Sequence, residues 1–262
     1  MSEPKDLTIG IEEEYQIIDP ESRELTSFIR EFLNQGAILF RDQLQPELLQ
    51  SQVEVGSKVC KNIQDVTAEI KRLRSMVCGL ANDNNRSILA AGTHPFSSWE
   101  DQLVTDKDRY HGFIDSMQIV AKRLLIFGMH VHIGISDRDL RIDIMNQMRY
   151  FMPHILTLST SSPFWRGEDT GFKSYRSIVF EDLPRTGTPE FFDSASAFDS
   201  YVETLIKSGC IDEPTKIWWD IRPHPTFSTL EFRICDCTTK VEEVTTIAAL
   251  IQALVAKLIQ LK

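Results

Sequence analysis

The sequence predicts an α+β fold in which a mixed, largely antiparallel sheet has helices on one side. Two patterns lead to this prediction. Stretches with apolar residues three and four positions apart, typical of helices, are interleaved with short β-rich segments. These short segments are apolar on one face and polar on the other, whereas the strands of a parallel sheet are usually buried on both faces and contain continuous apolar runs. The alternation therefore favours an antiparallel sheet over a doubly wound parallel one.

Helical spacing is clearest at residues 62–82, where Asn62 or Asp65 is a suitable N-cap. Three other stretches follow the same spacing less regularly: 106–126, 139–159 and 195–208. A last helix is predicted at 241–261, with an apolar stripe along one side. Such a stripe must pack against something. We expect it to cover the sheet of this domain, a missing segment or a partner.

Six segments predict strands: 7–18, 48–56, 87–92, 127–135, 216–222 and 228–236. The first contains TIGIEEEYQII at 8–18, with three consecutive glutamates between isoleucines. Because side chains alternate along a strand, Glu12 and Glu14 share one face and Glu13 lies on the other. On this stretch alone, a solvated edge strand that carries charge against aggregation is an equally good interpretation. Glu13 is expected to be a tolerated charge or a local salt-bridge partner.

The other predicted strands have the same alternation, and their polar faces carry chemically active side chains. Across five strands the polar faces carry Glu12, Glu14, Glu54, His130, His132, Asp220, Arg222, Glu231 and Arg233. If the apolar faces share one core, these groups share the opposite surface. Gly10, Gly128 and Gly134 lie on the same faces, and we expect them to leave room for a ligand.

Clustered carboxylates repel one another unless they are protonated or neutralised by cations, so the polar face predicts a metal site. The glutamates suit Mg²⁺, and with the histidines Mn²⁺ or Zn²⁺ is equally admissible. Arginines beside metal-bound carboxylates form a clamp for phosphate or carboxylate oxygens. The sequence has no GxxxxGK[ST] or GxGxxG motif, so a nucleotide would be held by metals and arginines. No GxSxG motif marks a nucleophile.

The composition is that of a globular protein, with 42% hydrophobic residues in a chain of 262. A net charge of −10 without a Lys/Arg block argues against a nucleic-acid partner. The N-terminus MSEPKDLT lacks signal-peptide features and no run of eighteen apolar residues occurs, which predicts a cytoplasmic protein with no membrane partner. Five scattered cysteines without a CxxC pair predict reduced thiols.

Seven motifs, taken together and in order, resemble the bacterial carboxylate–amine ligase branch of the glutamate–cysteine ligase type 2 family. They are GIEEEYQIIDP at 10–20, ELLQSQVEVGSKVC at 47–60, AGTHPFSSW at 91–99, RY at 109–110, FGMHVHIGI at 127–135, SSPFWRGEDTGFKSYRS at 161–177 and WDIRPHPTFSTLEFRICD at 219–236. An ordered set spread over nearly the whole chain is far more specific than any one motif.

The resemblance implies a curved, mainly antiparallel sheet like that of the glutamine synthetase and glutamate–cysteine ligase catalytic domains. It implies an ATP-dependent ligase, a weak glutamate–cysteine ligase, that forms an amide through a γ-glutamyl phosphate intermediate. The implied cofactors are ATP and Mg²⁺, with Mn²⁺ as an alternative, and the implied substrates are glutamate and a small amine such as cysteine. A homodimer is expected from the family and from the apolar stripe at 241–261.

The resemblance also assigns roles to residues. The positions that match metal ligands are Glu12, Glu14, Glu54, His130 and Glu231. Arg233 matches an arginine near the transferred phosphate, so Arg233 and Glu231 are the expected catalytic pair. Arg176 and Arg109 match positions that bind the amino-acid substrate, and Arg222, on the same polar face, is a further candidate for substrate binding.

The chain departs from the family at Lys262, beyond which family members continue. We expect residues 1–262 to form a single catalytic domain of a truncated form, a naturally short member or one half of a split enzyme. Two other functions stay open at this point. One is a non-catalytic relative that binds a metal–nucleotide or a protein, and the other is a metal-dependent hydrolase.

Overall fold

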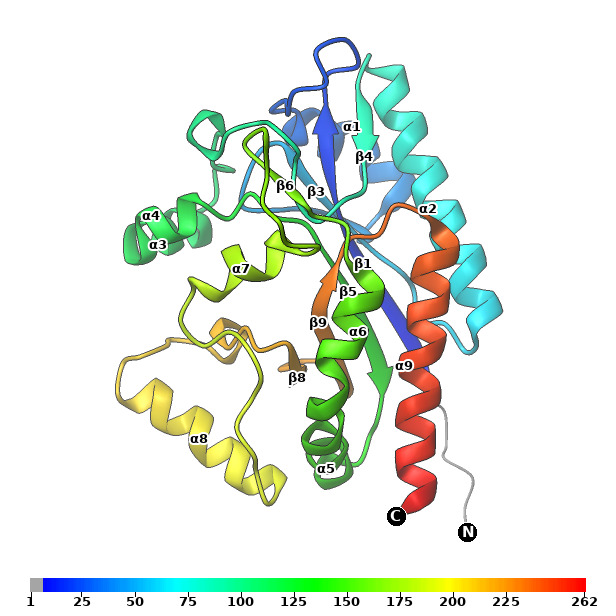
Figure 1. Cartoon of the computed structure of the whole chain (residues 1–262), viewed down its shortest axis with the longest axis vertical. Coiled ribbons are helices and arrows are strands. Elements are labelled where there is room, and N and C mark those ends of the chain that lie inside the picture. Colours follow the sequence, from blue (N-terminus) through cyan, green and yellow to red (C-terminus); the bar gives the residue numbers. More distant parts are fainter. Residues whose placement is uncertain (1–6) are drawn as a thin grey trace.

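The computed structural model describes residues 7–262, apart from the side chains of 37–39, and is built around a seven-stranded sheet (Figure 1). The strands are hydrogen-bonded in the order β2-β3-β1-β5-β9-β8, and β4 pairs with β1. Their bounds are β1 Ile9–Ile18, β2 Leu44–Pro46, β3 Gln52–Gly56, β4 Ser87–Leu89, β5 Gly128–Gly134, β8 Ile221–Pro223 and β9 Thr229–Asp236. All strand pairs in this sheet that the structure describes are antiparallel, which confirms the predicted class.

Helices and a small hairpin surround the sheet. The α-helices are α1 Ile29–Phe40, α2 Ile63–Asp83, α3 Asp108–Met117, α4 Ile119–Lys122, α5 Arg138–Met148, α6 Met152–Ser159, α7 Tyr175–Glu181, α8 Ala195–Lys207 and α9 Val241–Leu261. Short 3₁₀ helices occur at η1 Trp99–Asp101, η2 Arg149–Phe151 and η3 Pro214–Lys216. Strands β6 Phe164–Trp165 and β7 Glu168–Asp169 pair in a separate hairpin. Helices α1 and α7 were not predicted from the sequence.

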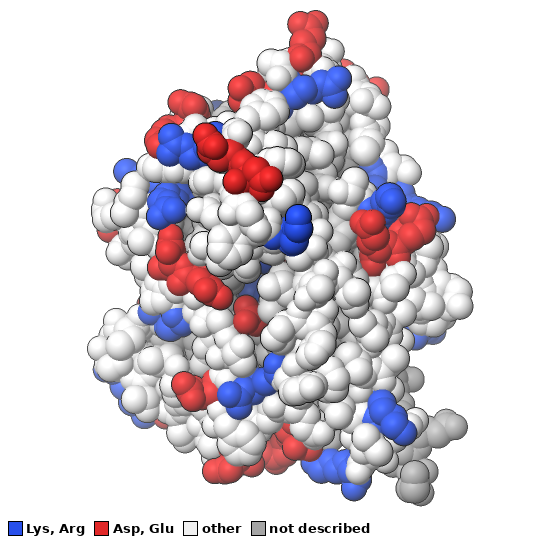
Figure 2. All heavy atoms as spheres, in the orientation of Figure 1, with Lys and Arg blue, Asp and Glu red and all other residues white. Residues whose placement is uncertain are grey.

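Helices α2 and α9 cover the apolar face of the sheet (Figure 1). Ile9 and Ile11 of β1 are almost fully buried in the same cluster as Val66 of α2 and Val244 of α9. The apolar stripe of α9 therefore packs against this domain's own sheet and against α2, α5 and α6. By length and composition alone α9 is also apolar enough to cross a membrane, a property that core helices share. The surface over α6 and α9 carries few charged side chains (Figure 2).

Two predicted helices are interrupted in the structure. The stretch 106–126 divides at Gln118, whose φ of 49° lies in the left-handed region and separates α3 from α4. The stretch 139–159 divides into α5, η2 and α6, with Pro153 in the first turn of α6. A proline lacks the N–H of a continuous helix but is tolerated in a first turn, which explains why a new helix begins there.

The predicted strand at 216–222 is shorter than expected. Only Ile221–Pro223 pairs with β9, and η3 occupies the start of the segment. The backbone N–H of Trp218 and that of Asp220 donate instead to carbonyl oxygens of Arg185 and Gly187, in the loop that follows α7. The loop after α7, rather than a neighbouring strand, therefore accepts the hydrogen bonds of these two N–H groups in the segment that alternation assigned to a strand.

A buried ion pair joins α2 to β1 and to the start of α9. Glu13 is fully buried on the apolar face, and its carboxylate accepts hydrogen bonds from Arg74 of α2 and from the Tyr15 hydroxyl. Arg74 also donates to the carbonyl oxygens of Thr238 and Thr239, at 2.7 and 2.6 Å. Glu13 is therefore a salt-bridge partner, as one of the two expectations for it proposed.

Replacing Arg74 should destabilise the fold strongly. In Arg74→Met the Glu13 carboxylate is left buried without its cation, a change that costs about 3–5 kcal/mol when one partner of a buried pair is removed. The free energy of unfolding from urea titration measures the loss. Lys71→Met, on an exposed position of the same helix, is the matched control. Glu13→Gln combined with Arg74→Met should recover a large part of the loss, and an Arg74→Met variant as stable as the control would refute this role.

Candidate active site

The register of the sheet brings acidic side chains of β1 and β3 together with histidines of β5 on the polar face. Glu14 lies directly opposite Glu54 in the β1–β3 pair. Glu12 lies opposite His130 in the β1–β5 pair. Side chains at opposed positions of neighbouring strands are close enough to interact. The predicted shared surface therefore follows from strand pairing, without help from loops.

The same face continues across β5, β9 and β8. His132 lies opposite Glu231, and Glu231 lies opposite Arg222. A cavity of about 1,000 Å³ opens over this face, bordered by α3 and α7, and we call it the carboxylate cavity. All the site residues predicted from the sequence line it: Glu12, Glu14, Glu54, Arg109, His130, Arg176, Arg222, Glu231 and Arg233. The structure thus places every predicted site residue in one cavity.

Two groups of three side chains have ligand atoms close enough to share a cation. Glu12, His132 and Glu231, here the histidine triad, have ligand atoms within 4.8 Å of one another. Glu14, Glu47 and Glu54, here the glutamate triad, meet the same criterion. These two triads stand side by side because Glu12 and Glu14 are neighbours on one face of β1.

Positively charged side chains of the protein offset the negative charge of the histidine triad. Glu231 is almost completely buried, and Arg222 Nε donates to it at 2.8 Å while Arg233 donates to its other oxygen. Burial alone raises the pKa of the Glu231 carboxyl, but the two guanidinium groups outweigh burial and hold the pKa well below its ordinary value. Burial also opposes ionisation of Glu12, yet the two histidines beside it, with His130 Nδ1 at 3.0 Å and His132 Nε2 at 3.4 Å from its oxygens, lower its pKa.

The glutamate triad has no comparable compensation within residues 7–262. Burial and the neighbouring carboxylates raise the pKa of Glu54 well above its ordinary value. Burial and the charge of Glu14 raise the pKa of Glu47 to about 7, although Arg109 acts in the opposite direction. Carboxylates that resist ionisation together become stable anions when a cation lies between them. This triad therefore needs either protons or a metal ion.

The donor atoms of both triads fit a divalent cation. The glutamate triad offers only carboxylate oxygens, which suit Mg²⁺ or Mn²⁺. In the histidine triad, His132 Nε2 is buried and has no hydrogen-bond partner among the described residues. Its Nδ1 lies 3.1 Å from the Thr229 hydroxyl. When one ring nitrogen is held by such a bond, the other is left free to bind a metal.

His132 and Glu47 are the two members that sequence reasoning did not assign as ligands. His130, the predicted ligand, lies beside the histidine triad, with its Nδ1 3.0 Å from Glu12 and 3.9 Å from Glu231. His132 shares the face of His130, so the i, i+2 spacing was the available signal. Glu47 lies between β2 and β3, outside any strand, where alternation gives no information.

Arg176 reaches the sheet from α7 and lies over Gly128 of β5. A Cβ on Gly128 would lie 3.0 Å from the Arg176 Cζ and closer still to its Nη2. The guanidinium donates to the carbonyl oxygens of Ile234 and Arg233, each at 3.2 Å. The expectation that the glycines leave room for a ligand is therefore wrong at Gly128, because a protein side chain fills that room. Gly10 likewise adjoins the His132 side chain.

Asp236 holds the segment that presents Arg176, a role that the sequence did not indicate. Its fully buried carboxylate accepts hydrogen bonds from the Ser162 and Ser174 hydroxyls at 2.6 and 2.7 Å and from the backbone N–H of Ser161 at 2.9 Å. The Ser162 hydroxyl in turn accepts a bond from the backbone N–H of Arg176 at 3.1 Å. Asp236 thus fixes the first turn of α7 relative to β9.

The other arginines of the cavity differ in exposure and in how many of their N–H groups already donate to the protein. Arg109 is exposed in the first turn of α3, at the rim of the cavity. Arg222 is buried, and its donors go to Glu231 and to the carbonyl oxygens of Thr215 and Ile217. Arg222 therefore orients Glu231 through Nε and Nη2, while its Nη1 is held by the two carbonyl oxygens. Arg233 Nε has no hydrogen-bond partner in the described part of the chain.

Comparisons with known proteins identify curated relatives that match nearly the whole chain. A protein of Roseiflexus castenholzii named "Putative glutamate--cysteine ligase 2" is 56% identical over 251 residues, covering 96% of this chain and 66% of the relative. A protein of the same name from Chloroflexus aurantiacus is 57% identical over 250 residues, covering 95% of this chain and 64% of the relative. The chain thus spans just under two thirds of the length of these curated relatives.

Solved structures show the same fold at low sequence identity. A bifunctional glutathione synthetase from Pasteurella multocida has a TM-score of 0.73 at 13% identity, over 95% of this chain and 39% of that one. The glutamate–cysteine ligase from Francisella tularensis, solved in complex with AMP, has a TM-score of 0.66 at 14% identity, over 90% of this chain and 62% of that one. The family model described as "Glutamate-cysteine ligase family 2 (GCS2)" matches residues 8–262. This match, together with the identities above, establishes that the chain belongs to glutamate–cysteine ligase family 2.

Proposed function

We propose that the protein is an ATP-dependent ligase that joins the γ-carboxylate of glutamate to a small amine such as cysteine, as a weak glutamate–cysteine ligase. The observation that carries the proposal is that Arg233 and the five carboxylates of the two triads line one cavity. Family membership and the names of the relatives indicate a ligase of this type. The substrates and the ATP dependence are our proposal, because the chain spans only part of its relatives.

The two triads would each hold one divalent cation, Mg²⁺ or Mn²⁺, with His130 beside the histidine triad. When bound, such cations would neutralise the negative charge of the ATP phosphates. The residues of the chain prepare for them in different ways. Arg222 orients the Glu231 carboxylate, and Thr229 orients the His132 ring. Glu14, Glu47 and Glu54 supply the negative charge that the protein itself does not offset.

The reaction would proceed in two transfers. The γ-phosphoryl group of ATP passes to a carboxylate oxygen of glutamate, which releases ADP and forms γ-glutamyl phosphate. The amine nitrogen then forms a bond to the acyl carbon, phosphate leaves with the C–O bond electrons, and the nitrogen loses a proton to solvent. Phosphoryl transfer is mostly positioning and charge stabilisation, so a protein nucleophile is not required.

The arginines would divide the work of binding and stabilisation. Arg233 is paired with Glu231 and has an unpartnered Nε, so it can donate to the transferred phosphoryl group. Arg176 and Arg109 would bind the carboxylates of the amino-acid substrate, with Arg176 fixed over Gly128 and Arg109 at the rim. Arg222, proposed from the sequence to bind substrate, would instead act through Glu231.

We further propose a cytoplasmic homodimer in which residues 1–262 form one catalytic domain. All five cysteines are free thiols, as is usual in a reducing compartment. The weakly charged surface over α6 and α9 is the candidate dimer face (Figure 2). Light scattering at micromolar concentration tests the dimer, and a monomeric mass would refute it.

Arg233→Met and Glu231→Gln should each lower the rate of ADP formation about a hundredfold or more, the usual loss for one preorganised electrostatic group. ADP release is measured with saturating ATP, Mg²⁺, glutamate and cysteine. Glu242→Gln, at an exposed position of α9, is the control. Near-normal rates in both variants would refute the site. ADP formed by the unmodified chain with water alone would indicate a hydrolase, and nucleotide binding without turnover would indicate a non-catalytic relative.

Glu47→Gln should change how stability depends on pH. The fold raises the pKa of Glu47 from 4.5 to about 7, so its stabilising effect is complete below 4.5 and is lost as the pH rises through 7. We expect the melting temperature of the metal-free protein to fall about 2–4 °C more than that of Glu47→Gln between about pH 5 and pH 8. At about pH 8, Mg²⁺ should raise the melting temperature of the unmodified protein more than that of Glu47→Gln. If the melting temperatures of the two proteins change with pH in parallel, both with and without Mg²⁺, the role of Glu47 is contradicted.

Gly128→Ala should impair substrate binding without unfolding the protein. The added Cβ displaces the Arg176 guanidinium, so we expect the KM for glutamate to rise about tenfold, equivalent to about 1.4 kcal/mol. Steady-state kinetics measure KM and kcat separately. Gly79→Ala on α2 is the matched control, because no atom of the described chain lies within 4 Å of its added Cβ. An unchanged KM in Gly128→Ala would argue against Arg176 as a substrate-binding residue.

A further inference from the structure

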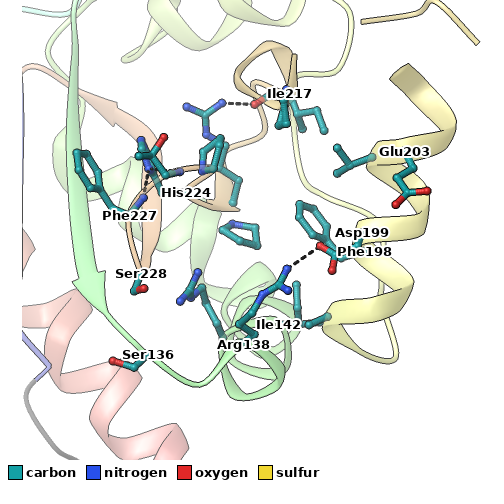
Figure 3. A pocket seen from close by; sticks show the side chains of 18 residues that line it. Ser136, Arg138, Ile142, Phe198, Asp199, Glu203, Ile217, His224, Phe227 and Ser228 are labelled. Carbon is teal, nitrogen blue, oxygen red and sulfur yellow. Dashed lines mark hydrogen bonds and ion pairs between the residues drawn. The ribbon is translucent and has the colours of Figure 1, made fainter. Parts of the chain in front are cut away.

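The proposed phosphoryl transfer leaves one border of the carboxylate cavity without a role. At another border, Arg222 and His224 also line the space between α5, α8 and the loop that joins β8 to β9 (Figure 3). The unused border is formed by α3, α7 and the residues around Trp218, where several apolar side chains reach the cavity. We call these side chains the apolar wall: Phe113, Leu124, Ile126, Phe180, Leu183 and Trp218.

The apolar wall has a buried base and rings that are left accessible. Its three aliphatic members are buried, whereas its three aromatic members are half-buried. All six belong to, or pack against, one hydrophobic cluster, so the wall is an extension of the core into the cavity. Apolar surface that stays accessible inside a cavity is typical of a site that a ligand covers.

Contacts within the protein hold two of these rings in place. Phe113 and Trp218 meet edge to face, with ring centroids 5.5 Å apart and an interplanar angle of 68°. Arg185, in the loop that follows α7, holds Trp218 in two ways. Its guanidinium lies 5.2 Å from the Trp218 ring centroid, and its carbonyl oxygen accepts the backbone N–H of Trp218 at 2.9 Å. Because rings that are already fixed lose little freedom on binding, such a wall can discriminate between ligand side chains.

The apolar wall adjoins the two arginines that we propose to bind amino-acid carboxylates. Arg176 Cζ lies 5.5 Å from the ring centroid of Phe180, one turn further along α7. Arg176 Nε is buried and has no hydrogen-bond partner in the described chain, so it can donate to a substrate carboxylate. Arg109 precedes Phe113 by four residues on α3, and helix positions four apart share a face. Each arginine therefore lies beside a ring of the wall.

Of the three reactants in the proposed reaction, the amine is the one that suits the apolar wall. The ATP phosphates would lie at the two triads. Glutamate is charged at both ends and offers only a short methylene chain between them. The reaction constrains only the nitrogen atom of the amine, so the rest of the amine can be apolar. The CH₂SH group of cysteine would leave most of the wall uncovered, whereas a larger apolar side chain would bury more of it.

We propose that the preferred amine is an α-amino acid with an aromatic or branched apolar side chain, and that cysteine is a poorer substrate. This inference rests on the proposed ligase function and narrows its amine. The side chain of the amine would contact Phe113 and Trp218, and its carboxylate would bind Arg109. The α-carboxylate of glutamate would bind Arg176. The apolar wall then gives a physical reason for weak activity with cysteine.

The first test compares amines that share the amino-acid backbone and differ only in the side chain: phenylalanine, leucine, alanine and cysteine. ADP formation is measured with saturating ATP, Mg²⁺ and glutamate. Since one methylene group in an apolar pocket changes kcat/KM about tenfold or more, we expect phenylalanine or leucine to exceed both alanine and cysteine by at least about tenfold. A kcat/KM for cysteine or alanine that equals or exceeds those of phenylalanine and leucine would overturn the inference.

The second test uses variants of the apolar wall. Phe113→Ala and Trp218→Leu should each lower kcat/KM and affinity for phenylalanine about tenfold, and change those for alanine less than about twofold. The split between the two amines separates loss of the wall from general misfolding. Trp218→Leu keeps the test decisive if Phe113→Ala folds poorly. Phe172→Ala, an exposed aromatic position outside the lining of the cavity, is the matched control. Equal losses for both amines, or no loss in either variant, would refute the role of the wall.

Titration calorimetry separates failure of this inference from failure of the proposed ligase function. Phenylalanine and alanine are titrated into the full chain with Mg²⁺ and glutamate, and phenylalanine should bind at least about tenfold more tightly. Selective binding without ADP formation would mean that the ligase proposal is wrong while the ligand class of the wall stands. ADP formation with equal binding of the two amines would mean the reverse. Displacement of phenylalanine by AMP would assign the wall to the adenine ring and overturn the inference.

Discussion

The crowding of carboxylates on one face of a single sheet is the constraint on which the rest of this structure depends. Glu12, Glu14, Glu54 and Glu231 meet there because antiparallel register places them opposite or beside one another. Their repulsion is resolved in two ways. Glu231 and Glu12 are paired with arginines and histidines of the protein, whereas the glutamate triad has only protons or an external cation. The two triads therefore differ in charge balance, because only the histidine triad has cationic side chains of the protein beside its carboxylates.

The opposite face of the sheet provides the rigidity that such a site requires. Apolar side chains of β1 and β5 pack beneath α2 and α9, and the buried Glu13–Arg74 pair joins strand and helix across that packing. One strand thus presents Glu12 and Glu14 to the cavity and Glu13 to the core. Three consecutive glutamates thus have three different environments. Glu12 lies beside histidines, Glu13 pairs with Arg74 and Glu14 belongs to the glutamate triad, because the direction of each side chain decides which partner it meets.

Much of this arrangement could be predicted from the sequence, because alternation along a strand depends only on local geometry. It assigned Glu12, Glu14, Glu54 and Glu231 to one surface before any contact was known. Alternation could not identify Glu47, because this residue lies outside the strands. It also could not predict the contact of Arg176 with Gly128, because the two residues lie far apart in the chain. The helix breaks at Gln118 and near Pro153 were not predicted for a related reason. The apolar spacing continues through both points, although the helical backbone is interrupted there.

The arginines show why residue type alone does not define a role. Arg222 and Arg141 are equally buried, at 7% exposure. Arg222 uses its donors on Glu231 and two carbonyl oxygens, so its charge is internal to the fold. Arg141 donates from Nε to the carbonyl oxygen of Ile135, so it holds α5 against the segment that follows β5. Two arginines with the same burial therefore hold different parts of the fold, because Arg222 orients a carboxylate of the candidate site whereas Arg141 fixes the connection between β5 and α5.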